Sequence, residues 1–306
     1  MMIKIGDSLG NYQIEDYLSK EGGTSLILLG RHTEKPDLKA AIKIHLGSDL
    51  RFQDLLRREV DILKGFYHPG IVRIYPQQIN GRVAYEAKAN WHSETPWYFT
   101  MEYIMGPSLD QIINKQFVRQ FPTEWIVELF YQVAVVVYYL HRSGYAHFDL
   151  KPSNILLRYP PSPDSVPSPV LIDFGITTKY KGPPDILGGS LRYSSPEVIE
   201  ARARPDARLN IMPGKADIWA LGAIFFELLT GRPLVNYNSE KRITTTIMQG
   251  ELDSLRSERP ELSSFLDGLL SAMINRDATR RPSINRILKA LEEEIAEVCP
   301  PRIVNK

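Results

Sequence analysis

The spacing of apolar residues changes along this chain, and this change constrains the fold more than any other feature of the sequence. Short β-compatible runs fill most of the first hundred residues, whereas helical spacing dominates after Met105-Gly106-Pro107. The expected strands are residues 12–18, 26–30, 39–46, 70–75, 82–87 and 97–103. The expected helices are residues 52–66, 108–114, 123–142, 216–230 and 283–298. A strand-rich unit followed by a helix-rich unit predicts an α+β protein with two lobes, 1–104 and 105–306.

Two segments between these elements are expected to be loops. Residues 158–169 read RYPPSPDSVPSP and contain five prolines, which lack the backbone donor that helices and sheets need. This loop is either a partner site or a tolerated insertion, and the sequence favours an insertion. Residues 180–189 are rich in glycine and proline and are expected to form a mobile surface loop.

Charge and composition narrow the classes of partner. Among 306 residues, 37 Lys and Arg balance 36 Asp and Glu, so the chain lacks the positive field of non-specific nucleic-acid binding. Its single cysteine, Cys299, cannot form an internal disulfide, which favours a reducing compartment and a cytoplasmic location. Glu128 and Gln132 interrupt the most apolar stretch, residues 125–140. That stretch therefore predicts a buried core helix, and no membrane partner is expected.

Two charged residues stand where burial is expected. Glu59 shares the apolar face of the helix at 52–66, and an unpaired buried carboxylate is costly. Either a cation approaches Glu59 or this face meets water. A candidate cation is Lys43, which shares a strand face with Ala41, while Ala40, Ile42 and Ile44 take the opposite face. Ala41 and Lys43 would line a cleft with room for a flat ligand; a solvated strand lysine is the alternative.

The middle of the chain concentrates chemically active side chains. Residues 144–157 have no helical period, yet Asp149, Lys151 and Asn154 fall within six positions. Asp173 ends the apolar run at 170–172 and precedes Gly175 by two residues. This pattern either presents a carboxylate to a metal or forms an ordinary turn after a strand.

Taken together and in this order, these motifs resemble the protein kinase family over residues 12–295. The matching motifs are AAIK ending at Lys43, Glu59, HPGIV at 68–72, MEY at 101–103, HFDLKPSN at 147–154, DFG at 173–175, SPE at 195–197, DIW at 217–219, and Arg281-Pro282. The resemblance implies one bilobal kinase domain, residues 12–296. It would have a small antiparallel β-rich N-lobe with one main helix and a larger α-helical C-lobe.

The resemblance assigns a role to each reactive residue. Lys43, held by Glu59, would grip the α- and β-phosphates, Asp149 would orient the substrate hydroxyl, and Lys151 would neutralise the moving phosphoryl group. Metal binding would fall to Asn154 and Asp173, which would hold Mg²⁺, with Mn²⁺ as an alternative. The residues expected to bind ATP are Leu18, Gly22, Gly23, Leu26, Ala41, Lys43, Met101, Glu102, Tyr103 and Leu156.

Five further residues are expected to be structural: His147, Phe174, Glu197, Asp217 and Arg281. Glu197 and Arg281 would form a buried ion pair. Asp217 would cap its helix and would bond the backbone amides of the catalytic loop, residues 147–154. Phe174 would stack with Leu63 and His147 between the lobes.

The sequence departs from the family pattern at two motifs. Ser19, Glu21 and Thr24 occupy the three positions of the glycine-rich loop, which predicts weaker ATP binding. Phe148 replaces the arginine that usually precedes the catalytic aspartate and pairs with a phosphorylated activation segment. Activity that does not depend on such phosphorylation is therefore expected.

The function implied is a serine/threonine protein kinase that transfers the γ-phosphoryl group of Mg-ATP to protein hydroxyls. Lys151 and the pair Gly189-Ser190 resemble serine/threonine rather than tyrosine kinases. The alternatives are a pseudokinase scaffold and a kinase-like small-molecule phosphotransferase. The presence of Lys43, Asp149, Asn154 and Asp173 argues against the first, and the SPE motif argues against the second.

Overall fold

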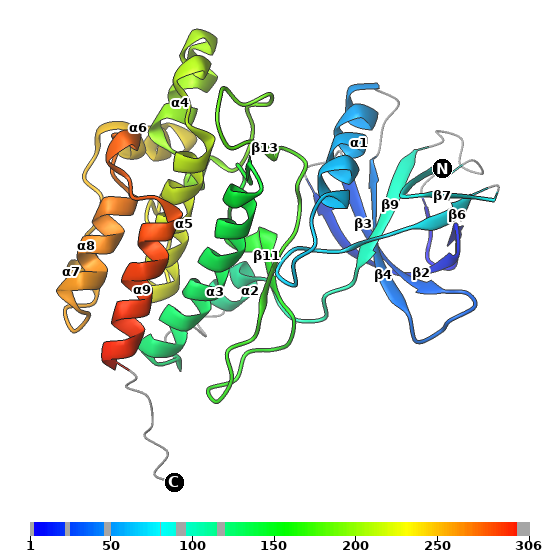
Figure 1. The fold of residues 1–306 in the computed structure, drawn as a ribbon, viewed down its shortest axis with the longest axis horizontal. Helices are drawn as coiled ribbons and strands as arrows, with labels where there is room; N and C mark the ends of the chain where they lie inside the picture. Colours follow the sequence, from blue (N-terminus) through cyan, green and yellow to red (C-terminus); the bar gives the residue numbers. More distant parts are fainter. Residues whose placement is uncertain are drawn as a thin grey trace. The chain divides into compact units, whose positions relative to one another are not determined.

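The computed structural model describes residues 3–21, 25–45, 50–79, 81–89, 96–114 and 120–298. The chain divides into two compact units (Figure 1). The N-terminal unit comprises residues 1–105 and 173–175, and the C-terminal unit comprises 106–172 and 176–306. This division differs from the predicted boundary after residue 104 at Met105 and at Asp173–Gly175. The latter three residues join the N-terminal unit because their polar groups bond to side chains there.

The N-terminal unit is built on an antiparallel sheet. Its elements are β1 (Ser8–Leu9), β2 (Tyr12–Glu21), β3 (Ser25–His32), β4 (Lys39–His45), α1 (Leu50–Lys64), β5 (Ile74–Tyr75), β6 (Gln77–Ile79), β7 (Arg82–Ala84), β8 (Glu86–Lys88) and β9 (Trp97–Glu102). The strand order is β1-β2-β3-β4-β9-β5, with β8 also paired to β9. The predicted strand-rich unit with one main helix is confirmed for the described residues.

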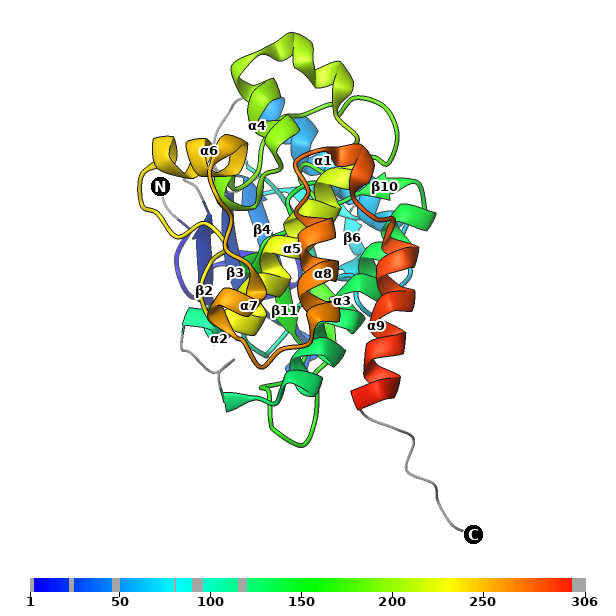
Figure 2. The same ribbon diagram turned by 90° about the vertical axis from the view of Figure 1, so that its left-hand side faces the viewer.

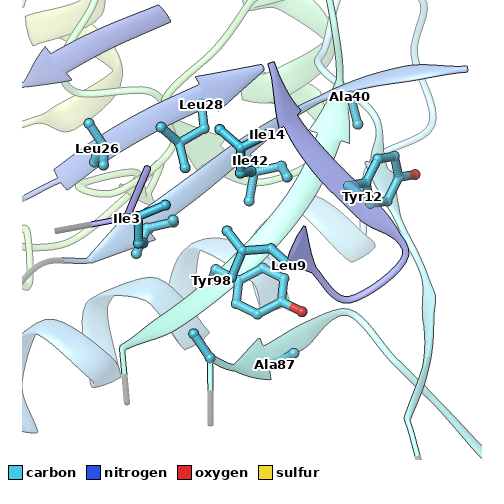
Figure 3. Close-up of a cluster of buried hydrophobic side chains, with 12 residues drawn as sticks. Ile3, Leu9, Tyr12, Ile14, Leu26, Leu28, Ala40, Ile42, Ala87 and Tyr98 are labelled. Carbon is cyan, nitrogen blue, oxygen red and sulfur yellow. The ribbon is translucent and has the colours of Figure 1, made fainter. Parts of the chain in front are cut away.

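The two faces of β4 have different environments. Ala40, Ile42 and Ile44 pack into a buried apolar cluster with residues of β2, β3 and β9, such as Leu28 and Tyr98 (Figure 3). Successive strand residues point to opposite faces, so Ala41 and Lys43 lie on the other side of the sheet. This is the division that the sequence predicted.

Helix α1 packs on the sheet through its apolar face. Leu56, Val60 and Leu63 are buried, as is Glu59. Near its start, the Gln53 Oε1 accepts a hydrogen bond of 3.0 Å from Trp97 Nε1 of β9. The helix thus carries a carboxylate into the interior of the unit.

Two predicted strands differ in the structure. The run at 70–75 forms a strand only at Ile74–Tyr75. The run at 82–87 divides at Tyr85 into β7, which pairs with β6, and β8, which pairs with β9. Gly81, at φ +75°, turns the β6–β7 hairpin. Periodicity alone could not show that the two halves have different partners.

The C-terminal unit is mainly helical. Its helices are α2 (Leu109–Asn114), α3 (Thr123–Arg142), α4 (Pro196–Ala203), α5 (Pro213–Thr230), α6 (Glu240–Gln249), α7 (Leu255–Glu258), α8 (Ser264–Met273) and α9 (Ile284–Val298). Its short strands are β10 (Tyr145–Ala146), β11 (Ile155–Leu157), β12 (Pro169–Leu171) and β13 (Thr178–Lys179). Single 3₁₀ turns are η2 (Pro152–Asn154), η3 (Leu191–Tyr193), η4 (Pro205–Asn210) and η5 (Ala278–Arg280). Helices α4 and α6 to α8 were not predicted.

Helix α5 forms the centre of this unit. It begins with proline at its first position and ends at Gly231, whose φ of +74° gives the left-handed cap. Helix α5 packs against α3 and α8, and α9 lies along α3 (Figure 2). Phe130 of α3 stacks on Phe225 of α5 with ring centroids 4.0 Å apart.

Helix α3 alone among the described helices is long and apolar enough to pass for a membrane span by length and composition. One face of it, including Val133, Val137 and Leu140, is buried within the unit. The predicted core helix is therefore present at the predicted residues.

Apart from Pro169, the two predicted loops contain no helix and no strand pairing beyond an isolated bridge between Ser162 and Ser165. The first loop is one residue shorter than predicted, because Pro169 begins β12. Proline can take this place as the first residue of a short strand.

Candidate functional site

Lys43 is the centre of a buried ion cluster in the N-terminal unit. Its Nζ lies 2.9 Å from the carboxylate of Glu59 and 2.8 Å from Oδ1 of Asp173. The side chains of Lys43 and Glu59 are only 5% and 2% exposed. The predicted Lys43–Glu59 pair is confirmed, and Asp173 is an additional partner that the sequence did not reveal.

The cluster keeps Lys43 charged. Burial alone would lower the pKa of Lys43, but the carboxylates of Glu59 and Asp173 outweigh burial and raise this pKa. The ammonium is therefore a permanent positive charge on the face of β4 that also carries Ala41. Such a group suits the binding of an anion that can replace one of the carboxylates.

The segment from Asp173 to Gly175 is held in an uncommon backbone conformation. Asp173 has φ +62°, a left-handed value that costs energy for a residue with a side chain. The amide of Phe174 donates to Glu59 at 3.0 Å, and the buried Phe174 ring packs against Phe66. These contacts hold the strained residue in place. The predicted stack with Leu63 and His147 spans the two units and stays a prediction.

A second group of polar side chains surrounds Asp149 in the C-terminal unit. Asp149 Oδ2 accepts from Lys151 Nζ at 3.0 Å and from Asn154 Nδ2 at 3.2 Å. Oδ1 accepts from the backbone amide of Ser190 at 3.0 Å. Gly189 is at φ +90°, and a Cβ there would approach Oδ1 of Asp149 to 2.9 Å, so this position requires glycine. Asp149 is thus held on both oxygens.

Asp217 of α5 binds the backbone of the segment that carries Asp149. Its two oxygens accept from the amides of His147 and Phe148 at 2.9 and 2.8 Å. The same carboxylate lies 2.9 Å from Nε2 of His141. These contacts hold Phe148 at φ +70° beside Asp149. The predicted bonds to the loop are confirmed, but the predicted helix cap is wrong because α5 begins earlier, at Pro213.

Asn154 fits a metal-binding role. Its Nδ2 donates to the backbone oxygen of Asp149 at 2.9 Å, while its Oδ1 is buried without a hydrogen-bond partner among the described residues. A hard cation would satisfy this oxygen. The described residues contain no cluster of three or more His, Cys, Asp or Glu side chains that could hold a metal. A cation at Asn154 would therefore need phosphate oxygens or water to complete its coordination.

One predicted nucleotide-binding residue lies on the wrong sheet face. Leu26 pairs with Ile44 and belongs to the apolar cluster of Figure 3. Ile27, directly opposite Lys43, takes the face that carries the ion cluster. Side chains alternate along a strand, so a register that is one residue different exchanges the two faces. The prediction for Leu26 is corrected in this way.

The remaining expected nucleotide contacts are distributed over both units. Ala41 faces Met101 across the β4–β9 pair, and both are buried. Leu18 is 40% exposed at a register irregularity between β2 and β3. The backbone amide of Glu102, the last residue of β9, donates to the backbone oxygen of Arg73.

The other expected nucleotide contacts stay predictions. Tyr103 is half-buried in the N-terminal unit, as is Leu156 in the C-terminal unit. Gly22 and Gly23 lie outside the described residues, as does Thr24.

Comparison with known proteins decides the family. The profile of the family described as "Protein kinase domain" matches residues 20–291, which is most of the chain. This chain belongs to the protein kinase domain family. The strand-rich and helix-rich units are the two lobes of its fold, and family membership implies use of ATP and a divalent metal.

Several curated relatives are serine/threonine kinases by name. Human "Serine/threonine-protein kinase ULK1" is 32% identical over 217 residues, which cover 69% of this chain and 18% of that protein. "Aurora kinase" of Candida glabrata is 28% identical over 286 residues, covering 92% of this chain and 70% of the relative. "Maternal embryonic leucine zipper kinase" of Xenopus tropicalis is 30% identical over 278 residues, covering 87% and 37%. The chain thus spans less than two thirds of the length of two of these relatives.

The C-terminal unit has the predicted structural ion pair. Arg281 donates from both terminal nitrogens to the two oxygens of Glu197, at 2.7 and 2.8 Å. The Arg281 side chain is fully buried and also lies over the ring of Trp219. This two-point geometry joins α4 to the segment before α9.

Besides the contact of Asp173 with Lys43, two further contacts were missed in the sequence. Arg202 of α4 donates to the oxygens of Gly188 and Gly189 and, at 2.9 Å, to Oγ of Ser194. It thereby joins the helix to the activation segment of the kinase, defined here as residues 173–197. The other is the amide of Ser190 on Asp149. Neither follows from spacing, because each joins segments that only the tertiary fold brings together.

The C-terminal unit also contains a buried carboxyl that should give its stability a pH dependence. Burial raises the pKa of Glu227 to about 7, although the Tyr193 hydroxyl donates to it at 2.7 Å and favours ionisation. The folded protein therefore binds this proton more tightly than the unfolded chain. The free energy of unfolding should fall as pH rises from about 4.5 to about 7, by roughly 3 kcal/mol at most, and should then level off.

The variant Glu227→Gln tests this expectation, because it carries no titratable group. Relative to wild type, it should gain stability as pH rises through this range. Urea unfolding at several pH values measures the difference, and a stability difference that does not change with pH would contradict the assignment.

Proposed function

We propose that this chain is a serine/threonine protein kinase domain that transfers the γ-phosphoryl group of Mg-ATP to serine or threonine hydroxyls of proteins. The observation that carries the proposal is the position of Asp149. One of its oxygens is fixed by Lys151 and Asn154, and the other by the Ser190 amide of the activation segment. A carboxylate held in this way is prepared to orient an acceptor hydroxyl.

The chain's own residues account for the proton and for the charge. The substrate oxygen forms a bond to the γ-phosphorus, the bond from that phosphorus to the β–γ bridging oxygen breaks, and ADP leaves. Asp149 orients the hydroxyl and accepts its proton, while Lys151 offsets the charge of the phosphoryl group. Lys43 would exchange part of its pairing with Asp173 for phosphate oxygens and remain paired with Glu59.

Magnesium would be held by Asn154 and Asp173. When bound, it would neutralise charge on the phosphate oxygens. The unpartnered Oδ1 of Asn154 supports this role. Asp173 would supply a carboxylate, whose Oδ1 is paired with Lys43 in this structure.

The pseudokinase alternative conflicts with these contacts. Lys43, Glu59 and Asp173 are joined as one cluster, and Asp149, Lys151 and Asn154 as another. A scaffold has no need for either set of charges. Transfer to proteins rather than small molecules is supported by the ion pair of Glu197 with Arg281, which braces the end of the activation segment.

Incubation with radiolabelled ATP, Mg²⁺ and a generic protein substrate tests the proposal. Label should appear as phosphoserine or phosphothreonine in the protein. Nucleotide binding without label transfer to any protein would leave the pseudokinase. Label transfer to small hydroxyl compounds alone would indicate the small-molecule phosphotransferase.

We infer further that this activity does not require a phosphorylated activation segment. Phe148 lies in a buried apolar cluster with Val198, Ile211 and Ala216, against which Ile176 and Leu187 of the activation segment pack. Hydrophobic contact at Phe148 thus replaces the contact between an arginine and a phosphorylated residue of the activation segment. Arg202 adds a second attachment through backbone oxygens, which needs no phosphate.

Treatment with phosphatase is expected to leave kcat/KM unchanged. Three hydroxyl residues of the activation segment, Thr177, Thr178 and Ser190, are candidate phosphate acceptors. Thr177 and Thr178 are buried, whereas Ser190 is partly accessible. The measurement is a kinase assay on protein shown by mass spectrometry to carry no phosphate. The variant Ser190→Ala is the control and should keep its activity. Loss of activity on dephosphorylation would contradict the inference.

A further inference from the structure

A cavity of about 340 Å³ lies in the C-terminal unit, and none of its lining residues belongs to the polar group around Asp149. It is enclosed by the start of α3, the end of α9 and the proline-rich loop that the sequence marked as an insertion. Its apolar surface comes from Trp125, Val127, Val166 and Ile295. The volume is at the lower end of the range for ligand pockets and suits one or two side chains.

The proline-rich loop is attached to the wall of this cavity. Nε1 of Trp125 donates to the backbone oxygen of Ser162 at 2.9 Å and to that of Ser165 at 3.3 Å. Phe121 stacks on Trp125 with ring centroids 4.1 Å apart. The loop is therefore held against α3 by hydrogen bonds. Its prolines limit the backbone freedom that binding would otherwise remove.

The charges around the cavity are all of one sign. Glu124, Glu128, Asp164 and Glu294 line it, and the described lining residues include no lysine, arginine or histidine. Two of these carboxylates have only neutral donors in the part of the chain that the structure describes. Glu294 accepts from the Ser263 hydroxyl at 2.7 Å, and Glu128 accepts from the Gln132 amide at 3.0 Å.

Glu294 is the most deeply buried of these carboxylates. It is 7% exposed, so water reaches it poorly, and no described cation forms an ion pair with it. A buried carboxylate without a cation destabilises the fold, and a ligand that brings a cation removes this cost. The helices that carry these groups are joined by the Tyr131 hydroxyl, which donates to Glu292 at 2.9 Å.

We propose that this cavity binds a segment of a partner protein that carries lysine or arginine next to an aliphatic residue. The basic group would pair with Glu128 and Glu294, and the aliphatic side chain would cover Val166 and Ile295. Lysine and arginine have apolar stems below their charged ends, so a single such side chain matches both the apolar wall and the carboxylates. The site would recruit a substrate or regulator and would not take part in phosphoryl transfer.

A differential peptide selection tests the proposal. The full chain is used to select from a displayed library of random twelve-residue peptides, with counter-selection on the double variant Glu128→Gln, Glu294→Gln. The double variant has the same catalytic residues, so peptides that bind at the active site are removed. The selected sequences should contain Lys or Arg beside Leu, Ile, Val or Met.

Synthetic fluorescein-labelled forms of the selected peptides then quantify binding by anisotropy. The double variant should bind about tenfold more weakly or worse, and so should peptides with the basic residue changed to glutamine. Glu293→Gln, an exposed position of the same helix, should bind like wild type. Glutamine keeps the size of each side chain, and unchanged kinase activity of the double variant would show that it is folded. If it does not fold, Glu128→Gln alone serves the same comparison.

Three results would overturn the proposal. The first is a selection whose peptides bind wild type and double variant equally. The second is a set of selected peptides without basic residues. The third is binding that is seen only after residues 299–306 are removed, since the occupant would then be the chain's own end.

Discussion

Replacing Asp149 with asparagine is expected to lower kcat about 10²–10⁴-fold, the range that a positioned general base contributes. Asparagine has the same shape, so the Ser190 amide could still donate to its side-chain oxygen. The amide cannot accept the proton of the substrate hydroxyl, however. Binding of ATP should remain close to wild type, because Lys43 and Glu59 belong to the other unit. Steady-state kinetics and a fluorescent-nucleotide titration separate the two effects.

Asp206→Asn is a suitable control for this variant. Asp206 is an exposed aspartate of the same unit, in η4, and the change should leave kcat unaltered. If Asp149→Asn retained most of the activity, Asp149 would not be the residue that accepts the substrate proton. The proposed function would then lose its main support. Loss of ATP binding together with kcat would instead indicate that the catalytic loop is disordered by the substitution.

Replacing Glu197 with glutamine is expected to lower the free energy of unfolding of the C-terminal unit by about 3–5 kcal/mol. The substitution keeps the volume of the side chain but leaves the fully buried Arg281 without a counter-charge. The remaining acceptors of Arg281 are neutral backbone oxygens, such as that of Asn275 at 2.7 Å. Urea unfolding followed by circular dichroism measures the loss.

Glu200→Gln provides a matched comparison on the same helix. Glu200 pairs with Arg204 one turn later, and both side chains are well exposed. Exposed pairs of this kind contribute about 0–1 kcal/mol, so the control should unfold almost like wild type. Equal stability losses for the two variants would mean that burial does not strengthen the Glu197–Arg281 pair.

The Glu197–Arg281 pair and the Glu227 carboxyl are expected to affect the free energy of unfolding in different ways. The first is a buried two-point ion pair, and the Glu197→Gln variant measures its contribution. The second should contribute only a change between about pH 4.5 and pH 7. Urea unfolding of the Glu197→Gln and Glu227→Gln variants at several pH values therefore distinguishes them.

Local sequence pattern was sufficient for the elements that depend on near neighbours. The helix around Glu59, the core helix α3 and the two faces of β4 all follow from side-chain periodicity, which reflects the geometry of a single helix or strand. The reactive residues of the catalytic loop were also found, because six positions of one loop carry an acid, a base and an amide. Their pairing with one another is a consequence of that short spacing.

Features that depend on register or on long-range contact were not accessible in the same way. The sheet face on which Leu26 lies depends on the register of β3 against β4, because a shift of one residue exchanges Leu26 with Ile27. The position of Asp217 in α5 depends on where the helix begins, and its first residue is set by the loop before it. Residues 82–87 divide between two partner strands that lie elsewhere in the chain.

Sequence by itself determined which residue types carry the chemistry and the secondary structure around them, because these depend on groups a few positions apart. Only the tertiary structure decided that Asp173 shares Lys43 with Glu59, that Ser190 and Arg202 hold the activation segment, and that four carboxylates surround one apolar cavity. The physical reason is that each of these arrangements joins residues far apart in the chain. Their distances are set by the packing of whole helices and strands, which no local pattern encodes.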